Sequence, residues 1–256
     1  NLALIDYSQA IKLAPEDLLN WYNRADAYYY YWGDYEQALN DYEQVLKIDP
    51  ADIDAINSKG VIYEEQGKLE LAIKEHEKGI ALEEIAPESA AYCYINRARL
   101  FAEQEQYDKA LADYTKAIEL DPENLDFYNI LGDFYRAKLN QPHNAINQHT
   151  RAINIDSTNS DAWHYRAFSY GSLHDYKMAI NDNKYIITEI DSNNVIAMTW
   201  IGVYYDYLNE KDKAIKIFQQ VIDKYNSGHE FNNDDINGGI AWSLTNLAVS
   251  EEEVYN

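Results

Sequence analysis

The sequence is poor in helix-breaking residues and in cysteine. Among 256 residues there are 10 glycines, 5 prolines and one cysteine, Cys93. A single cysteine excludes an intrachain disulfide and a cysteine-based metal site, and it leaves the redox compartment open. Because so little glycine and proline is available for a long flexible linker, we expect the chain to be ordered nearly throughout.

Positive charge and long apolar runs are also scarce. Lys and Arg number 21 against 44 Asp and Glu, which gives a formal net charge of −23. Such a charge disfavours nucleic acid and anionic membrane surfaces and favours cationic partners. The longest uncharged apolar run, Val195 to Tyr205, has only eleven residues. It is too short to span a bilayer and is better explained as a buried helix.

Motifs that carry chemistry are missing as well. The six histidines include no HxxxH pair of the kind found in helical zinc sites. The sequence contains no glycine-rich phosphate loop and no GxSxG elbow. The segment NNDDING at 232–238 superficially resembles a calcium loop but lacks the closing glutamate, which favours a helix-capping turn. We therefore predict no enzyme, no cofactor and no metal site.

What the sequence does contain is an internal repeat. The segment DYEQALNDYEQVLKIDP at 34–50 returns as QYDKALADYTKAIELDP at 106–122, with Tyr, Ala-Leu, Asp-Tyr and Asp-Pro kept in place. Alignment on its alanine finds seven alanines spaced 34 to 38 residues apart. They are Ala3, Ala38, Ala72, Ala110, Ala145, Ala179 and Ala214.

Each repeat predicts two amphipathic helices. The first has a small residue with a bulky side chain four positions before it and an aromatic three positions after it, which puts all three on one helical face. A neighbouring helix can approach closely at the small residue. The second helix carries the alanine and, four residues later, an aromatic or a histidine; His76 and His149 in this slot are predicted to pack in the core. Asp-Pro or its substitute ends it. The small residues are Ala25, Gly60, Ala98, Gly132, Ala167 and Gly202.

This helix–turn–helix unit, with its period of about 34 residues, resembles the tetratricopeptide repeat family over essentially the whole chain. The resemblance implies an all-α fold, an α-α superhelix (solenoid) of stacked tetratricopeptide helix hairpins. We expect one residue inserted near Trp32, another near Asn140, and an enlarged turn from Glu83 to Ala90. The expected segments are a half repeat at 1–14, repeats at 18–52, 53–90, 91–124, 125–159, 160–194 and 195–228, a C-terminal capping helix at about 233–249 and a tail at 250–256.

Four repeats carry a cation just before the small residue and a carboxylate just before the aromatic slot, whereas the other two carry neither. We predict that the two charges meet between the helices of each repeat. Common descent from one ancestral unit is the alternative, but Lys59 with Glu75 changes both residues while keeping both charges. If the pairs are exposed, each would contribute about 0.2–1 kcal/mol, enough to fix the packing of the helices but not to dominate stability. The pairs are Arg24 with Asp41, Lys59 with Glu75, Arg97 with Asp113 and Arg166 with Asp182.

The resemblance also implies a function. Such proteins generally bind extended peptides or protein partners on a concave surface lined by the first helices, and they perform no chemistry. The thirty residues at positions 2, 5, 9, 12 and 13 of the six repeats include nine acidic and two basic residues, so the net charge is −7, against −23 in all 256. We predict an extended segment with Lys or Arg and apolar anchors as the ligand; the alternative is an ordinary acidic, solvated face. The candidate residues are Tyr22, Asp26, Tyr29, Tyr30, Asn57, Glu64, Tyr92, Arg99, Asp126, Asn129, Asp133, Arg136, His164, Phe168, Asp206 and Tyr207.

One specific function of the family is disfavoured by the sequence. Tetratricopeptide domains that grip the acidic C-terminal tails of chaperones use a clamp of Lys, Asn and Arg side chains on three first helices. The matching positions hold Tyr and Asp on the first helix, Asn57 on the second, and Tyr, Ile and Arg99 on the third. Only Asn57 and Arg99 could serve, so the clamp is not formed here.

Two further roles stay open at this stage. The chain could be the recognition arm of a larger enzyme whose catalytic domain lies outside these residues, or it could self-associate through the unpaired helix at 1–14. We expect a bacterial, cytoplasmic protein with a protein or peptide partner, no nucleic acid and no membrane span. Export to the periplasm stays open because Asn1 is not a start methionine.

Overall fold

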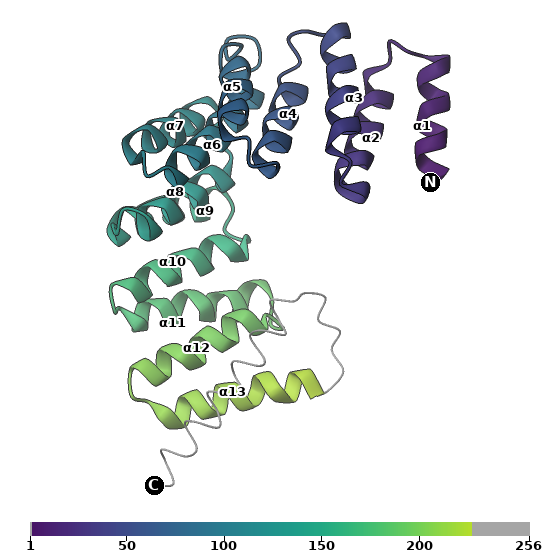
Figure 1. The fold of residues 1–256 in the computed structure, drawn as a ribbon. Helices are drawn as coiled ribbons and strands as arrows, with labels where there is room; N and C mark the ends of the chain where they lie inside the picture. Colours follow the sequence, from purple (N-terminus) through teal and green to yellow (C-terminus); the bar gives the residue numbers. More distant parts are fainter. Residues whose placement is uncertain (1, 227–256) are drawn as a thin grey trace. The chain divides into compact units, whose positions relative to one another are not determined.

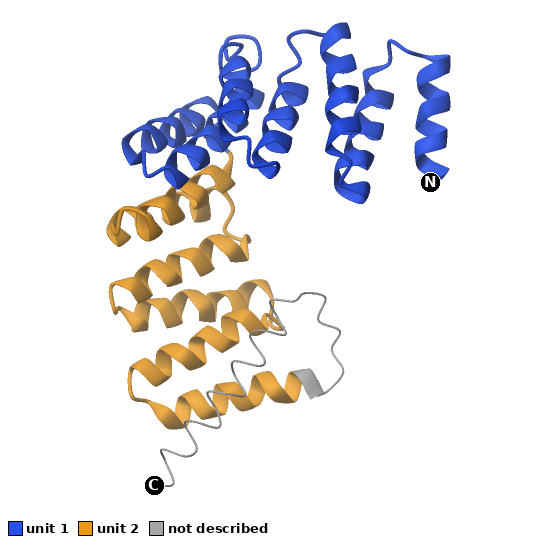
Figure 2. Cartoon of the chain, in the orientation of Figure 1, with its two compact units in different colours: residues 1–123 blue, residues 124–256 orange. Residues whose placement is uncertain are grey.

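The computed structural model describes residues 2–226, which form helices and turns with no strand among them (Figure 1). The predicted all-α class is confirmed. The chain divides into two compact units, residues 1–123 and 124–256 (Figure 2). Unit 1 contains α1 (Leu2–Leu13), α2 (Leu18–Ala27), the π-helical turn η1 (Tyr28–Trp32), α3 (Tyr35–Ile48), α4 (Ile53–Glu65), α5 (Leu69–Ile80), α6 (Pro87–Glu103) and α7 (Tyr107–Leu120).

Unit 2 continues the same alternation of helices. Each repeat forms a pair, here called helix A and helix B, and neighbouring helices within a unit pack side by side (Figure 1). The expected capping helix at 233–249, the tail, and residues 227 and 228 lie outside the described residues. The helices of unit 2 are α8 (Leu125–Ala137), α9 (Pro142–Ile155), α10 (Ser160–Ser172), α11 (Tyr176–Tyr185) with η2 (Ile186–Ile190), α12 (Val195–Tyr207) and α13 (Lys211–Asn226).

Short polar side chains at both ends of the connecting turns explain where the helices stop and start. The aspartate that ends a helix B accepts a hydrogen bond from the backbone two residues later, as Asp49 does from the Ala51 amide at 3.0 Å. The Asp or Asn before the next helix A then accepts a hydrogen bond from a backbone amide two or three residues later, as Asp52 does from Ala55 at 2.9 Å. These are turn and N-cap bonds, and they satisfy amides that the helix leaves unpaired.

The extra residues of the longer repeats are absorbed in two ways. Residues Tyr28–Trp32 form a π-helical turn, which takes up the residue expected near Trp32. The residue expected near Asn140 instead lengthens the end of α8, where the Leu139 amide donates a hydrogen bond to the carbonyl of Phe134, five residues earlier, at 3.3 Å. A third insertion, which the sequence analysis did not place, forms the π-helical turn Ile186–Ile190.

The enlarged turn is shorter than the sequence indicates. We expected it to extend to Ala90, but α6 begins at Pro87. Proline fits the first helical position because its missing N–H has no partner there in any case. Ala90 and Ala91 are fully buried, so packing of these small side chains favours the earlier start.

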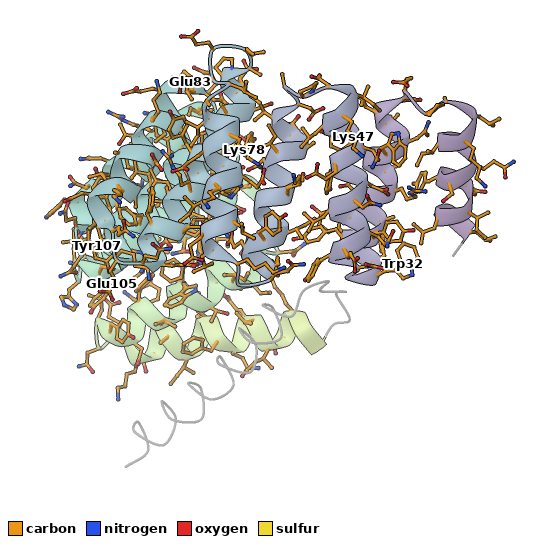
Figure 3. All side chains as sticks on the ribbon, turned by 45° about the horizontal axis from the view of Figure 1, so that its top comes forward. Trp32, Lys47, Lys78, Glu83, Glu105 and Tyr107 are labelled. Atoms are coloured by element: carbon orange, nitrogen blue, oxygen red, sulfur yellow. The ribbon has the colours of Figure 1, made fainter. Side chains whose placement is uncertain are left out.

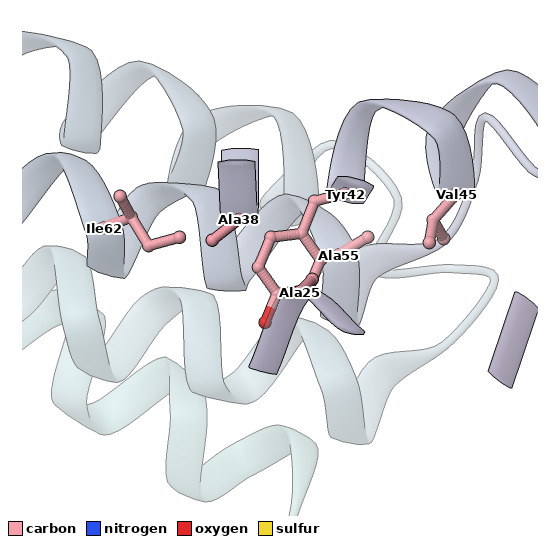
Figure 4. Packing of buried hydrophobic residues seen from close by; sticks show 6 residues of the cluster. All are labelled: Ala25, Ala38, Tyr42, Val45, Ala55 and Ile62. Carbon is pink, nitrogen blue, oxygen red and sulfur yellow. The ribbon is translucent and has the colours of Figure 1, made fainter. Parts of the chain in front are cut away.

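The core follows the repeat signature. In unit 1 the alanine of helix B, Ala38, lies with Ala25 of helix A and with Tyr42 in one buried cluster (Figure 4). In unit 2, Ala179 of α11 and Ala167 of α10 belong to an equivalent cluster. The apolar run that begins at Val195 forms the buried helix α12, as expected. Among residues 2–226 no helix is long and apolar enough to cross a membrane.

Both core histidines pack as predicted against glycines. His76 and His149 are fully buried, and a Cβ atom added at Gly60 or Gly132 would lie within 3.0 Å of the facing imidazole ring. Gly202 stands in the same relation to Phe218. The small residue of helix A is therefore required by the ring on helix B.

Gly132→Ala is expected to destabilise unit 2 by roughly 1–3 kcal/mol, because the added methyl group overlaps the buried ring of His149. In an unconstrained helix the same change would stabilise by about 0.5–1 kcal/mol, so its sign is informative. The double variant Gly132→Ala/His149→Asn should recover part of the loss, because the next repeat holds Ala167 and Asn183 at the same two positions. Urea midpoints and hydrogen exchange across α8 and α9 measure this. A more stable Gly132→Ala variant would contradict the proposed fit.

The four predicted charge pairs all form, and their carboxylates are buried. Each of three arginines donates two hydrogen bonds of 2.7–2.8 Å to one carboxylate. Lys59 approaches Glu75 at 3.8 Å. The acceptors Asp41, Glu75, Asp113 and Asp182 are only 1–7% exposed.

The cations also contact the helix B of the preceding repeat, which sequence analysis did not foresee. The partner stands five residues after the repeat alanine. One cation therefore ties three helices together. The contacts are Arg24 with Ser8 at 3.0 Å, Lys59 with Glu43, Arg97 with Glu77 at 3.9 Å and Arg166 with Thr150 at 3.2 Å.

Candidate functional site on the helix-A faces

The predicted site residues lie on α2, η1, α4 and α6 in unit 1 and on α8, α10 and α12 in unit 2. We call these two surfaces the helix-A faces and define them by positions 2, 5, 9, 12 and 13 of each repeat. The face of unit 1 carries five acidic residues and one basic residue, a formal net charge of −4. The face of unit 2 carries four acidic residues and one basic residue, a net charge of −3.

A polar network joins α4 to α6 in unit 1. Arg99 lies 2.5 Å from the carboxylate of Glu64 and donates to Asn96 at 3.4 Å. Asn96 in turn donates to the Asn57 side chain at 2.9 Å. Burial raises the pKa of the Glu64 carboxyl, and the charge of Arg99 offsets part of that rise. The sequence analysis did not include Asn96, which follows a predicted position directly along α6.

Two of the predicted residues on α2 are held by contacts inside unit 1. The Tyr22 hydroxyl donates to Asp52, the residue that caps α4. Asp26 accepts a hydrogen bond from the hydroxyl group of Tyr42 on α3. These bonds fix Tyr22 and Asp26 in place and leave them less available to a ligand.

The end of the first helix A in unit 1 exposes aromatic rings. Tyr30 is 73% exposed, and its ring meets that of Tyr29 edge to face at a centroid distance of 4.6 Å. Trp32 follows at the end of η1, at the edge of the unit (Figure 3). Tyr92 on α6 is 48% exposed. This part of the face therefore presents flat rings to solvent.

In unit 2, one guanidinium is placed between a carboxylate and a ring. Arg136 forms an ion pair with Asp133, one turn earlier on α8. The same guanidinium lies 5.9 Å from the centroid of Phe168 on α10. The face therefore already holds one cation against an aromatic ring, an arrangement that attracts through the ring quadrupole.

His164 belongs to a compact aromatic group. Its ring lies edge to face with Phe168 at 4.5 Å, and Phe168 meets Trp200 of α12 at 4.5 Å. His164 Nδ1 lies 2.9 Å from the Asn183 side chain. Burial lowers the pKa of His164, so the imidazole is neutral at pH 7 and adds no positive charge. Trp200 was missed because it lies one position beyond the predicted set.

The remaining candidate residues differ in how far their side chains are exposed to a ligand. Asn129 is only 7% exposed, and its Oδ1 has no hydrogen-bond partner. Tyr207 is 58% exposed, and its ring lies 5.1 Å from that of Tyr176. Asp206 is partly exposed and Asp126 is exposed on the first turn of α8. The described part of the chain, residues 2–226, contains no cluster of His, Cys, Asp or Glu suited to holding a metal ion.

Comparison with known protein families identifies the same repeat at five places. Models described as tetratricopeptide repeats match residues 53–85, 91–124, 113–147 and 197–225, and a model described as a TPR repeat matches residues 29–67. Together these matches span more than half of the chain.

Individual relatives are similar in sequence to about a third of the chain. Hsp70-Hsp90 organizing protein 3 of Arabidopsis thaliana is 28% identical over 93 residues, which is 36% of this chain and 16% of that protein. The chain spans less than a fifth of the length of the curated relatives that it matches.

Two solved structures resemble larger parts of the chain. YrrB, described as a TPR protein with an unusual peptide-binding site, is 21% identical with a TM-score of 0.54, covering 73% of this chain and 93% of its own. Yeast Tom70 is 14% identical with a TM-score of 0.64, covering 98% of this chain and 58% of its own. With its signature positions packed as described and its repeats matched along the sequence, the chain belongs to the tetratricopeptide repeat family.

Proposed function

We propose that this chain is a non-catalytic protein–protein interaction scaffold whose helix-A faces bind an extended segment with Lys or Arg side chains and apolar anchors. The observation that carries the proposal is the combination of unpaired negative charge and exposed rings on the same surfaces. Complementary charge would recruit the segment, and the aromatic rings would hold it.

The charge argument depends on which acids are already neutralised. Glu64 pairs with Arg99, and Asp133 pairs with Arg136, so the two basic residues of the faces are matched within the protein. Five other acids of the faces are exposed to solvent and carry the excess charge that a basic ligand would meet. They are Asp54, Glu65 and Glu103 in unit 1 and Asp126 and Asp161 in unit 2.

The aromatic argument has a precedent inside the protein. Arg136 lies over Phe168, and Lys184 lies 5.4 Å from the centroid of Tyr205. A ligand cation could use the exposed rings of Tyr30 and Tyr92 in the same way, with a stabilisation of about 0.5–1 kcal/mol at exposed sites.

Acidic chaperone tails fit these faces poorly. Arg99 is engaged by Glu64 and Asn96, and Asn57 already accepts a hydrogen bond from Asn96. The relative from Arabidopsis thaliana is named for Hsp70 and Hsp90, but both basic residues of the helix-A faces described here are already paired within the protein, whereas a carboxylate ligand needs free cations.

Charge reversal on one face tests the proposal. Asp126→Lys/Asp161→Lys should weaken binding of a synthetic segment alternating Lys with Leu by roughly tenfold, because exposed charge contacts contribute about 0.2–1 kcal/mol each. Binding to the unmodified protein should also weaken between ~50 and ~500 mM salt as screening increases. Isothermal titration calorimetry measures both.

The matched control changes the net charge equally outside the helix-A face. Glu189→Lys/Asp212→Lys alters two exposed acids elsewhere in unit 2 and should leave the affinity nearly unchanged. Equal weakening by both double variants would reduce the effect to net charge alone. A natural partner that binds through an acidic segment would overturn the proposed polarity.

The recognition-arm alternative has its own test. Purification from the native source would show whether a catalytic domain lies on the same polypeptide. If it does, the helix-A faces would serve to select the substrate protein of that domain. The charge-reversal experiment is unaffected by this outcome because it measures binding only.

A further inference from the structure

The turn between α2 and α3 exposes three consecutive aromatic side chains. Tyr30 is 73%, Tyr31 is 82% and Trp32 is 42% exposed. The two residues before them, Tyr28 and Tyr29, pack against the buried cluster of this repeat. The chain therefore passes from core to solvent within the π-helical turn η1. We call Tyr30, Tyr31 and Trp32 the aromatic turn.

The fold does not require rings at this place. A residue with left-handed backbone follows helix A in each complete repeat of unit 1: Gly33 with φ of 61°, Gly67 with φ of 70° and Glu105 with φ of 60°. The three residues before it read YYW in the first repeat, EEQ in the second and AEQ in the third. Since the same turn is made elsewhere from polar and small residues, folding alone does not account for three large exposed rings, and a contiguous group of this kind marks an interaction site.

The rings meet in edge-to-face pairs. Tyr30 lies against Tyr29 at a centroid distance of 4.6 Å and an interplanar angle of 62°, and Tyr29 in turn lies 6.0 Å from Tyr35 of α3. Tyr31 and Trp32 are 6.0 Å apart at 72°. In such a pair the edge of one ring occupies the face of only one other, so flat ring surface stays open to a ligand.

Each ring of the aromatic turn also carries a hydrogen-bond donor. Tyr30 and Tyr31 have hydroxyl groups, and Trp32 has an indole N–H. Among residues 2–226 none of these three groups has a hydrogen-bond partner. By contrast, the hydroxyl of Tyr22 on the same unit donates to Asp52. The aromatic turn therefore combines flat rings with unused donors.

We propose that the aromatic turn binds a proline-rich segment in the polyproline II conformation. Such a segment presents prolyl rings that pack on aromatic rings, and its backbone forms no internal hydrogen bonds. Because proline lacks an N–H, the segment offers carbonyl acceptors and needs donors, which the two hydroxyl groups and the indole N–H supply. Its preformed shape also loses little conformational entropy on binding, which suits an exposed surface without deep burial.

The inference rests on the proposed function in one respect. Tyr30 also belongs to the helix-A face of unit 1, so the extended segment bound there would continue across the aromatic turn. Tyr31 and Trp32 lie outside the five positions that define the face. The inference therefore names proline as the apolar anchor at this end of the face, whereas the charge argument concerns the acids along it.

A synthetic peptide of about ten prolines, roughly three turns of the polyproline helix, tests the inference. With acetylated and amidated ends it is uncharged, and isothermal titration calorimetry measures its binding to the full chain. It should bind with an affinity that is nearly the same at ~50 and ~500 mM salt. Tyr31→Ala/Trp32→Ala should weaken binding at least tenfold. Tyr31→Phe keeps the ring but removes the donor and should weaken it about threefold, the effect of one neutral hydrogen bond.

Matched controls separate the aromatic turn from general stickiness and from the helix-A face. Ile85→Ala removes an apolar side chain that is 67% exposed elsewhere in unit 1 and should leave the affinity unchanged. A Gly–Ser peptide of equal length should not bind. Tyr31→Ala/Trp32→Ala should still bind the segment alternating Lys with Leu as the unmodified protein does. If that segment binds and the proline peptide does not, this inference alone is wrong; the reverse result overturns the proposed charge preference and leaves the aromatic turn as a proline site.

Three further results would overturn the inference. The first is equal weakening of proline binding by Ile85→Ala and by Tyr31→Ala/Trp32→Ala. The second is undiminished binding by Tyr31→Phe, because the choice of proline depends on the donors. The third is that Tyr31→Ala/Trp32→Ala abolishes binding of oligosaccharides or of phosphatidylcholine vesicles but not of the proline peptide, since the occupant would then be a sugar or a lipid surface.

Discussion

Replacing Arg166 with isoleucine should destabilise unit 2 by about 3–5 kcal/mol, because it leaves the buried carboxylate of Asp182 without its counter-charge. Asp182 is 3% exposed and takes both of its strong hydrogen bonds from this guanidinium at 2.8 Å. Burial raises the pKa of Asp182, and Arg166 offsets only part of that rise. The carboxylate is therefore already costly to desolvate, and removing its partner adds to the cost.

The double variant Arg166→Ile/Asp182→Ile should recover most of this loss. The chain provides the precedent, since the same two positions hold Ile201 and Ile217 in the last described repeat, and Ile201 is fully buried. Replacing a whole buried ion pair by apolar residues is often neutral, whereas removing one partner is not. The same rule accounts for the repeats having either both charges or neither.

Hydrogen exchange across α10 and α11 measures the local effect, and urea midpoints measure the total. Local measurement matters because each repeat of such a stack contacts mainly its neighbours. Lys213→Ile provides the control, since Lys213 pairs with Glu210 but is 61% exposed, and its loss should cost less than about 1 kcal/mol. If Arg166→Ile costs no more than Lys213→Ile, or if the double variant is as unstable as the single one, this account of the pairs is wrong.

The sequence specified the repeat because its signature is local. Alanine, small and aromatic positions at helical spacing predicted which faces pack, and the alanines of the six complete repeats, Ala38 to Ala214, are fully buried. The ion pairs were predictable for another reason: the two charges appear and disappear together. Neither observation reveals burial, and so the sequence left open that Asp41 and Asp182 lie inside, only 1% and 3% exposed.

Features that depend on how the chain absorbs extra residues were harder to predict. The residue added between Ala179 and Ala214 has no sequence marker, and it forms a π-helical turn at Ile186–Ile190 within a continuous helix. The early start of α6 depends on room for Ala90 and Ala91 in the core. Both outcomes are decided by tertiary packing and not by local preference.

In the candidate site, too, some features follow from the sequence and others depend on tertiary packing. The resemblance to the tetratricopeptide family supplied the five positions per repeat that define the helix-A faces, and the sequence then supplied the acids and aromatic rings at those positions. Which acids remain available depends on neighbouring helices: Glu64 is paired from α6, whereas Asp126 and Asp161 are exposed. For the same reason Asn96 and Trp200 emerged only once adjacent helices were placed.

The double variant His76→Phe/His149→Phe should be more stable than the unmodified protein, and its advantage should grow as the pH falls. Both imidazoles are fully buried with neither ring nitrogen hydrogen-bonded. Phenylalanine fits opposite glycine in this slot, as Phe218 does opposite Gly202. At pH 7 the replacement removes unsatisfied polar atoms, each of which costs about 1–3 kcal/mol when buried.

The pH dependence follows from where each ring is protonated. Burial lowers the pKa of His76 to about 4, and the charges of Arg97 and Arg99 act in the same direction. Burial likewise lowers the pKa of His149 to about 4; Asp133 opposes this shift, while Arg136 and Arg166 add to it. In the unfolded chain both rings return to a pKa near 6.5. Between pH 6.5 and 4 the unfolded state therefore binds more protons than the folded state. The free energy of unfolding consequently decreases as the pH is lowered through this range.

By pH 4 each histidine should have removed roughly 3 kcal/mol of the stability present at pH 7, since one pKa unit corresponds to about 1.4 kcal/mol. Urea midpoints of the unmodified and doubly substituted proteins from pH 7.5 to 4 measure the difference in stability between them. Titration of the carboxylates largely cancels in this difference because both proteins contain the same carboxylates. His143→Phe changes an exposed histidine on the same helix as His149 and should leave the dependence of stability on pH unaltered.

Each single variant should act on its own unit: His76→Phe on hydrogen exchange in α4 and α5, and His149→Phe on hydrogen exchange in α8 and α9. Parallel pH profiles for the unmodified protein and the double variant would mean that these rings are protonated equally easily in the folded and unfolded chains, which full burial without a hydrogen-bond partner does not allow.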